Sequence, residues 1–256
     1  MLKIDLNCDL GESFGAYKCG MDEEVLPHIS SANVACGFHA SDPMVMDATV
    51  ALAAAQGVAV GAHPGYPDLV GFGRRSMSVS PAELKAMTQY QIGALEAFCR
   101  AHGVRMQHVK PHGAMYNMAA RDMKLARAIC EGVAAVNPGL ILLGLSGSCL
   151  VDAAAEVGLR CAREVFADRA YEEDGSLVAR GKPGAIIDSE DETIHRVIRM
   201  VREGRVRAIS GRDIDVRADS VCLHGDGAHA VAFARRISEA LRGEGIAVAP
   251  LSEVVD

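Results

Sequence analysis

The chain has 256 residues, half of them hydrophobic, and a formal net charge of −7 with its 26 Lys and Arg residues scattered along the sequence. We find no basic patch of the kind that binds nucleic acid or an anionic membrane. No apolar run is long enough to span a bilayer, and the N-terminus lacks the basic-then-apolar pattern of a signal peptide, so we expect a soluble cytoplasmic protein.

Short apolar runs alternate with helical patterns along the whole chain. We predict strands at residues 2–8, 32–36, 58–62, 106–109, 140–145, 159–166 and 220–223. Helices are predicted at residues 43–56, 81–102, 123–136, 150–157 and 189–203, with a last one that ends near residue 242. Asp42 and Ser80 are expected to cap helices, because each precedes a proline at the first helical position. Gly113 is expected to form a tight turn after the fourth strand.

The alternation of strands and helices implies a parallel sheet, either closed as a barrel or open and doubly wound. Polar loops follow almost every predicted strand instead of gathering at one switch point, which favours the barrel. We find no sequence repeat beyond the alternation and no linker. Residues 1–256 are therefore expected to form a single βα-barrel catalytic domain of the α/β class.

The eight cysteines include no CxxC pair. Several lie inside predicted strands or helices, where Cys acts as a small apolar residue. We interpret them as reduced thiols, not as disulfides or a zinc site, which fits a cytoplasmic location.

Polar side chains gather where the predicted strands end. They are Asn7, Asp9, Glu12, His39, His63, Lys110, His112, Glu164, Asp168, Arg169, His224 and Asp226. Each of them alone is more simply explained as a helix cap or a turn residue with its own hydrogen bonds. Because the strand ends of a parallel barrel meet at one pole, the set as a whole predicts a shared site.

Three kinds of chemistry are open to such a cluster. His with Asp or Glu can bind a divalent metal that activates water, or can act as general acid and base without a metal. Lys110 and Arg169 can hold a carboxylate or a phosphate, the arginine in bidentate fashion. The histidines are widely spaced and form no HExxH motif, so the sequence leaves metal binding open.

Familiar nucleotide-binding and nucleophile motifs are missing: the chain contains no GxxxxGK[ST], no GxGxxG and no GxSxG. The stretch GFGRR at residues 71–75 is either an anion-binding loop or a surface turn with solvated arginines. The long polar loop that ends at Gly184 is expected to be a lid or a subunit contact.

Six stretches in order closely resemble the LamB/YcsF family over essentially the whole chain. They are DLNCDLGESFG (5–15), ANVACGFHA (32–40), GAHP with GFGRR (61–64 and 71–75), VKPHGA (109–114), EVFADRAY (164–171) and LHGD (223–226). Three places depart from the family pattern: Ser41 stands where Gly is usual, Ala179 where Pro is common, and residues 227–229 where an Asn-rich turn is usual.

The resemblance implies a seven-stranded βα barrel similar to the glycoside hydrolase/deacetylase superfamily. It also implies ATP-dependent opening of 5-oxo-L-proline (pyroglutamate) to L-glutamate, with ATP as co-substrate and with partner subunits B and C of a 5-oxoprolinase. A metal-dependent deacetylase or amidohydrolase that acts on a sugar or a cyclic amide is the alternative. A non-catalytic subunit that only binds substrate or partners is a more distant one.

Under the 5-oxoprolinase hypothesis, ATP would phosphorylate the amide oxygen and water would attack the ring carbonyl carbon. The acid/base work is expected of Asp9, His39, His112 and Asp226. Binding of substrate or phosphate is expected of Asn7, Glu12, His63, Lys110, Glu164, Asp168, Arg169 and His224. Glu12 and His63 are also suited to orienting water or binding a divalent metal. The sequence does not select the general base among these groups.

Overall fold

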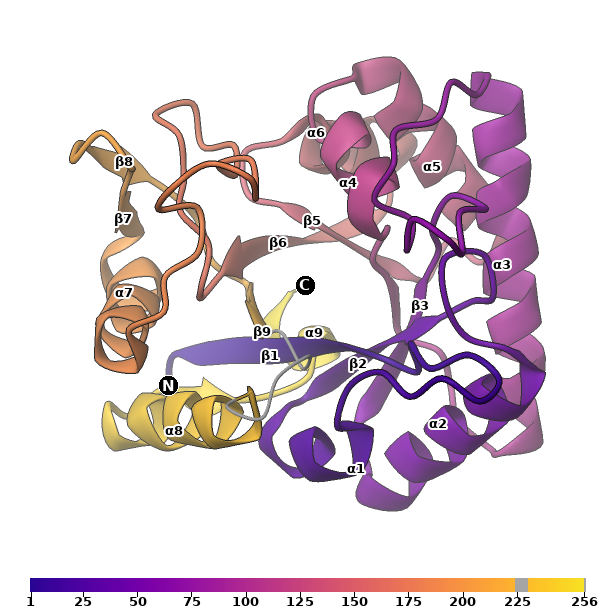
Figure 1. Ribbon diagram of the computed structural model, residues 1–256, viewed down its shortest axis with the longest axis horizontal. Coiled ribbons are helices and arrows are strands. Elements are labelled where there is room, and N and C mark those ends of the chain that lie inside the picture. Colours follow the sequence, from indigo (N-terminus) through magenta and orange to yellow (C-terminus); the bar gives the residue numbers. More distant parts are fainter. Residues whose placement is uncertain (224–229, 256) are drawn as a thin grey trace.

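The computed structural model describes residues 1–223 and 230–255. Within these residues, seven parallel strands close into a ring surrounded by helices (Figure 1). In ring order they are β1 (Lys3–Leu10), β2 (Ser31–Ala35), β3 (Ala59–His63), β4 (His108–Val109), β5 (Ile141–Leu145), β6 (Arg160–Phe166) and β9 (Ser220–Leu223). Strand β9 pairs back with β1, for example through Leu6 and Val221, so the predicted seven-stranded βα barrel is confirmed.

Strand β1 is longer than predicted, which corrects the place of two site residues. The sequence pattern ended this strand at residue 8, with Asn7 at its end and Asp9 in the following loop, but the strand continues to Leu10. Both side chains point into the barrel, because Lys110, which follows the non-adjacent strand β4, bonds to each of them. The prediction failed because polar residues at alternate positions were taken for the end of the strand, whereas the inside of this barrel is polar.

Helices cover the outside of the ring and agree with the predicted ones (Figure 1). They are α2 (Pro43–Gln56), α3 (Pro81–Ala101), α5 (Met123–Val136), α6 (Cys149–Val157), α7 (Glu190–Glu203) and α8 (Ala230–Gly243). The predicted caps are present: the Asp42 carboxylate accepts from two backbone N–H groups at the start of α2, and Ser80 forms a capping box with Glu83.

The structure also contains short elements that the sequence pattern does not predict. They are α1 (Asp22–Val25), the 3-10 helix η1 (Leu26–His28), α4 (Gly113–Ala119), β7 (Arg205–Arg207), β8 (Asp213–Asp215), β10 (Ala247–Val248) and α9 (Leu251–Val254). Each is too short for a hydrophobic period to be recognised. Gly113 does adopt the left-handed conformation expected of a turn, with φ of 53°, but helix α4 begins at this residue.

The C-terminal segment covers the amino end of the barrel. Strand β10 pairs in parallel with the start of β1, outside the ring. Helix α9 follows it, and two contacts tie this helix to the strand starts: Lys3 pairs with Glu253, and Gln107 donates to the Ser252 hydroxyl. Figure 1 shows α9 beside β1 and β9. The opposite, carboxyl end of the barrel carries the polar loops.

The expectations about membrane-spanning segments and about the cysteines can also be compared with the structure. In the described part of the chain, no helix has both the length and the apolar character needed to cross a membrane. All eight cysteines lie in the described residues as free thiols, and most of them are buried.

Candidate active site at the barrel mouth

A cavity of about 760 Å³ opens at the carboxyl ends of the barrel strands. This volume falls within the range of roughly 300–1,000 Å³ that is typical of small-molecule sites. Residues 174–180 of the loop after β6 form part of its wall, which is the loop that the sequence suggested as a lid or contact. Six of the predicted site residues line the cavity: Asp9, Glu12, His63, Lys110, His112 and Arg169.

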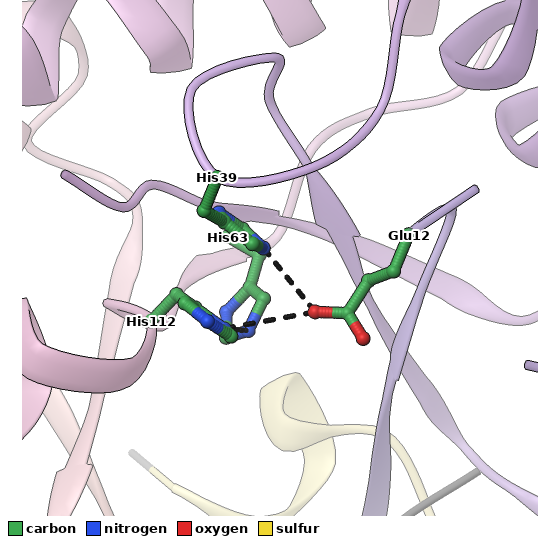
Figure 2. A group of neighbouring side chains, drawn as sticks. All are labelled: Glu12, His39, His63 and His112. Carbon is green, nitrogen blue, oxygen red and sulfur yellow. Dashed lines mark hydrogen bonds and ion pairs between the residues drawn. The ribbon is translucent and has the colours of Figure 1, made fainter. Parts of the chain in front are cut away.

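Glu12, His39, His63 and His112 form a compact group that we call the histidine cluster (Figure 2). One nitrogen or oxygen atom from each residue lies within 4.8 Å of those of the others. The four residues come from the ends of β1, β2, β3 and β4, which are consecutive in the ring. Parallel pairing of consecutive strands therefore brings together side chains that are widely spaced in the sequence.

Backbone carbonyls orient two of the imidazole rings. His63 Nδ1 donates to the Lys110 carbonyl at 2.7 Å, and His112 Nε2 donates to the Phe72 carbonyl at 2.8 Å. The ring of His39 stacks on that of His112, with centroids 3.7 Å apart and planes 3° apart. These contacts hold the rings in place, as expected of side chains whose orientation matters for binding.

The GFGRR stretch is a turn with exposed arginines, as one of its two interpretations predicted, and it also orients His112. Phe72 has a φ of 53°, a left-handed conformation that a non-glycine residue rarely adopts, and its carbonyl receives the His112 N–H. A Cβ atom on Gly73 would lie 2.7 Å from atoms of both His39 and His112. Arg75 bonds to Asp68, whereas Arg74 lines the cavity. The loop thus positions His112 and contributes one arginine to the site.

Burial sets the protonation of the stacked rings. Burial and, after it, the neighbouring His63 lower the pKa of His112 to about 3. Burial also lowers the pKa of His39 well below its usual value, with a further contribution from His112. Both rings are therefore neutral near pH 7.

Asp9 and Lys110 form a buried ion pair at the floor of the cavity. Lys110 Nζ lies 2.9 Å from Asp9 Oδ1 and 2.9 Å from Glu164 Oε1. Burial by itself lowers the pKa of Lys110, but the two carboxylates raise it well above its usual value. Burial by itself raises the pKa of Asp9, but the charges of His63 and Lys110 bring it well below its usual value. Both groups are therefore charged at neutral pH.

Tyr116 is a site residue that the sequence analysis missed. Its hydroxyl donates to Glu164 Oε2 at 2.6 Å, and it also lines the cavity. The available signal is its position four residues after His112, in the short helix α4 that this residue precedes. Tyr116 extends the buried polar network from Lys110 to the cavity wall.

Arg169 lines the cavity and carries a buried donor that no described residue uses. Its side chain is buried, and its Nη2 donates to the Val178 carbonyl at 2.6 Å. No described residue accepts a hydrogen bond from its Nε. A buried donor without an acceptor is costly, so a carboxylate or phosphate of a substrate is a natural partner.

The other predicted site residues are absent from the described lining of the cavity. Asn7, His39 and Glu164 are fully buried behind residues that line the cavity, and none of the three lines it among the described residues. Asp168 is partly buried in the loop after β6 and is likewise absent from the described lining. His224 and Asp226 lie outside the described residues.

Below the cavity, a second group of polar side chains fills the barrel, and we call it the interior layer. It consists of Asp5, Asn7, Asn33, His108 and Ser220. Asn33, another residue that the sequence analysis missed, joins it to the site by donating to Asp9 Oδ1. A Cβ atom on Gly61 would lie 2.2 Å from His108 Nε2, so glycine at this position of β3 makes room for the ring.

Comparison with known proteins identifies similar chains. The sequence profile of the LamB/YcsF family matches residues 4–256. A Clostridium beijerinckii protein, named as the A subunit of 5-oxoprolinase, is 65% identical over 254 residues, which cover 99% of this chain and 100% of that protein. The crystal structure of the lactam utilization protein from Thermus thermophilus has a TM-score of 0.92 at 50% identity and covers 97% of this chain and 99% of that one.

More distant structures share the fold alone. A T48 deacetylase, solved with its substrate, has a TM-score of 0.50 at 13% identity and covers 99% of this chain and 90% of that one. The barrel therefore shares its fold with this deacetylase, as expected.

Proposed function

Because the chain belongs to the LamB/YcsF family, we propose that it is the A subunit of a 5-oxoprolinase and forms one catalytic domain. It opens the lactam ring of 5-oxo-L-proline to give L-glutamate, in a complex with subunits B and C that hydrolyses ATP. The names of its relatives and their coverage of the whole chain support this assignment. The observation that carries it is the cavity at the barrel mouth, which has acid/base groups and anion-binding groups on its walls.

ATP has a chemical purpose in this reaction, because a five-membered lactam is a stable amide. Transfer of the γ-phosphoryl group to the amide oxygen makes the ring carbon a better electrophile and releases ADP. A first water molecule then adds to that carbon, and the ring C–N bond breaks as the nitrogen takes a proton. The resulting acyl phosphate reacts with a second water molecule to give glutamate and phosphate.

The cavity residues divide this chemistry between them. Asp9 and His112 line the cavity and take or deliver the protons. Lys110 is already bonded to Asp9 and Glu164, so its main effect is to keep Asp9 ionised. Arg169 lines the cavity, and its guanidinium receives the carboxylate or phosphate group. His39 is a positioning residue, since it stacks behind His112.

One observation favours the second candidate function, a metal-dependent deacetylase or amidohydrolase. The histidine cluster supplies three imidazoles and a carboxylate to one small volume, as metal-dependent hydrolases do. Such an enzyme would act on an acetylated sugar or a cyclic amide without ATP.

The test is the formation of glutamate and ADP from 5-oxoproline and ATP, by this chain alone and mixed with subunits B and C. We expect both products in the mixture, in equal amounts, and neither from the chain alone. Absence of glutamate in both would contradict the proposed function. Chelator-sensitive release of acetate or amine from acetylated sugars or cyclic amides, without ATP, would then favour the second candidate.

A further inference from the structure

We infer that the histidine cluster binds one divalent transition-metal ion, with Zn²⁺ as the first choice, at the wall of the active-site cavity. The inference deepens the proposed function and rests on it for the role of the cavity. Its basis is the arrangement of hydrogen-bond donors and acceptors among the four side chains in Figure 2.

The two carbonyl contacts determine which ring nitrogens carry lone pairs. A carbonyl oxygen only accepts, so His63 Nδ1 and His112 Nε2 must carry the protons in their bonds to Lys110 and Phe72. In the neutral form of the imidazole, which is the form that binds a metal, the other nitrogen is an acceptor with a free electron pair. His63 Nε2 and His112 Nδ1 are these acceptors, and they lie 3.0 Å apart.

Further acceptors surround the same point. Asp9 Oδ2 lies 3.3 Å from His63 Nε2. Glu12 Oε1 lies 3.6 Å from His112 Nδ1 and 3.2 Å from His39 Nε2. Protons on His39 Nε2 and His63 Nε2 let these groups bond to one another, so their electron pairs become available to an ion when those protons leave. A metal ion bound to the three imidazoles and Glu12 would take the place of these protons, as metal binding to histidine does.

The spacing of the acceptors suits a small metal ion. Zn²⁺ binds nitrogen and oxygen at about 2.0–2.2 Å, so neighbouring ligand atoms of a tetrahedral site are roughly 3.3–3.6 Å apart. The three separations of 3.0, 3.2 and 3.6 Å within the cluster lie close to this range. Only small side-chain shifts are needed to receive the ion. The carbonyl partners of His63 and His112 are also typical of metal-ligating histidines.

The donor set and the position of the cluster define the kind of site. Three imidazoles with one carboxylate favour Zn²⁺ and related transition-metal ions over Mg²⁺ and Ca²⁺, which prefer oxygen ligands. Glu12, His63 and His112 line the cavity, while His39 lies behind them. The four side chains would fill a tetrahedral site, so water or substrate would reach the ion as a fifth ligand from the cavity side. A bound ion would supply Lewis acidity or an activated water there, and Asp9 would then carry the proton transfers, since His112 would serve as a ligand.

Metal binding can be measured without substrate, ATP or partner subunits. The full chain is stripped with a chelator and titrated with Co²⁺, whose visible absorption reports nitrogen and oxygen coordination, and Zn²⁺ is then added to displace it. We expect one Co²⁺ per chain and complete displacement. His63→Ala and the conservative variant Glu12→Gln are expected to weaken Co²⁺ binding at least tenfold, since loss of a ligand or its charge weakens a metal site.

The matched control is His195→Ala, which removes an exposed histidine on helix α7 and is expected to bind Co²⁺ like the wild type. Circular dichroism of each variant separates loss of the site from loss of the fold. A wild-type chain that takes up no stoichiometric Co²⁺ or Zn²⁺ would overturn the inference, as would unchanged binding by both folded cluster variants.

The two proposals fail in different ways. Metal binding without glutamate formation in the complete mixture would reject the 5-oxoprolinase function and keep the metal site. The reverse result is full 5-oxoprolinase activity of a mixture in which elemental analysis finds no metal in this chain. It would keep the proposed function and overturn the metal site.

Discussion

The histidine cluster and the interior layer are both buried groups of polar side chains inside one barrel, but their hydrogen bonds differ. In the interior layer, His108 donates to Asn33, Asn33 to Asn7, Asn7 to Ser220 and Ser220 to Asp5, so each donor meets an acceptor. In the histidine cluster, three imidazoles and the Glu12 carboxylate converge beside the cavity, with His63 Nε2 and His112 Nδ1 3.0 Å apart.

This difference separates structural from functional polar groups. A chain of donors and acceptors of this kind stabilises the barrel. A cluster of three imidazoles and a carboxylate beside a cavity is arranged to bind a ligand, which we propose is a metal ion. Burial and residue type alone would not distinguish the two groups, since both contain histidines and carboxylates.

The largest effect is expected from removing groups at the cavity. Asp9→Ala and His112→Ala should each lower kcat of the assembled enzyme about a thousandfold or more, because proton transfer contributes roughly 10²–10⁴-fold. The fold should persist, since both residues lie at the open end of the barrel. The measurement is glutamate formation together with thermal unfolding.

An interior-layer variant provides the contrast. Asn33→Leu removes the acceptor of the His108 N–H group and the donor to the Asn7 side-chain oxygen. It should therefore lower the free energy of unfolding by about 1–3 kcal/mol.

Near-normal activity of both Asp9→Ala and His112→Ala would remove these residues from the mechanism. A loss of stability in His112→Ala as large as that of Asn33→Leu would erase the distinction between the two groups.

A smaller effect on activity is expected at Arg169. Arg169→Met should raise KM for 5-oxoproline roughly tenfold to a hundredfold, the equivalent of one charge-assisted hydrogen bond. Arg169→Lys should recover only part of the loss, because it keeps the charge without the planar fork. Arg105→Met, at an exposed arginine before β4, is the control. An unchanged KM in Arg169→Met would show that substrate does not use this donor.

The interior layer predicts a pH dependence of stability. Burial raises the pKa of Asp5 from its ordinary 3.8 to about 6, although three serine hydroxyls partly oppose this. As the pH rises from about 4 to about 6, the unfolded chain releases this proton while the folded chain retains it, so the free energy of unfolding falls. The loss should be on the order of 3 kcal/mol and complete by about pH 7.

The neutral variant Asp5→Asn isolates this effect. The measurement is the free energy of unfolding by urea denaturation between about pH 4 and pH 7. Over this range, the wild type should lose on the order of 3 kcal/mol more than the variant. Parallel curves for the two proteins would mean that Asp5 ionises as readily in the barrel as in the unfolded chain.

The smallest effect is expected at Ser41, which departs from the glycine usual in the family. Ser41 has a φ of 74°, a left-handed conformation that glycine adopts without strain. Ser41→Gly should therefore stabilise the protein, but by less than about 1 kcal/mol, because glycine also gains entropy in the unfolded chain. Urea denaturation would measure the change. A clear loss of stability would mean that the Ser41 hydroxyl contributes more than its weak contact with the Asp42 carbonyl suggests.

Much of the fold could be predicted from the sequence, because it rests on local signals. Asp42 and Ser80 occupy the cap positions expected of them, and the alternation of apolar runs with helical patterns indicates a parallel barrel. Short elements such as α4 and β10 could not be predicted, because a few residues show no period and their conformation depends on the strands they contact.

The site was predicted less completely. The pattern of polar residues at strand ends points correctly to the cavity for Asp9, His63, His112 and Arg169. It misses Asn33 and Tyr116, whose importance comes from contacts with residues distant in the sequence.

By itself, the sequence determined the alternation of elements, the helix starts and the set of polar residues near the strand ends, since these depend on neighbours along the chain. Only the tertiary structure decided that Asn7 and Asp9 point into the barrel, because strand alternation leaves open which face is inside. It also decided the proton positions on His63 and His112, because the carbonyls of Lys110 and Phe72 reach those rings only after the strands have paired. Long-range pairing turns scattered histidines into a site.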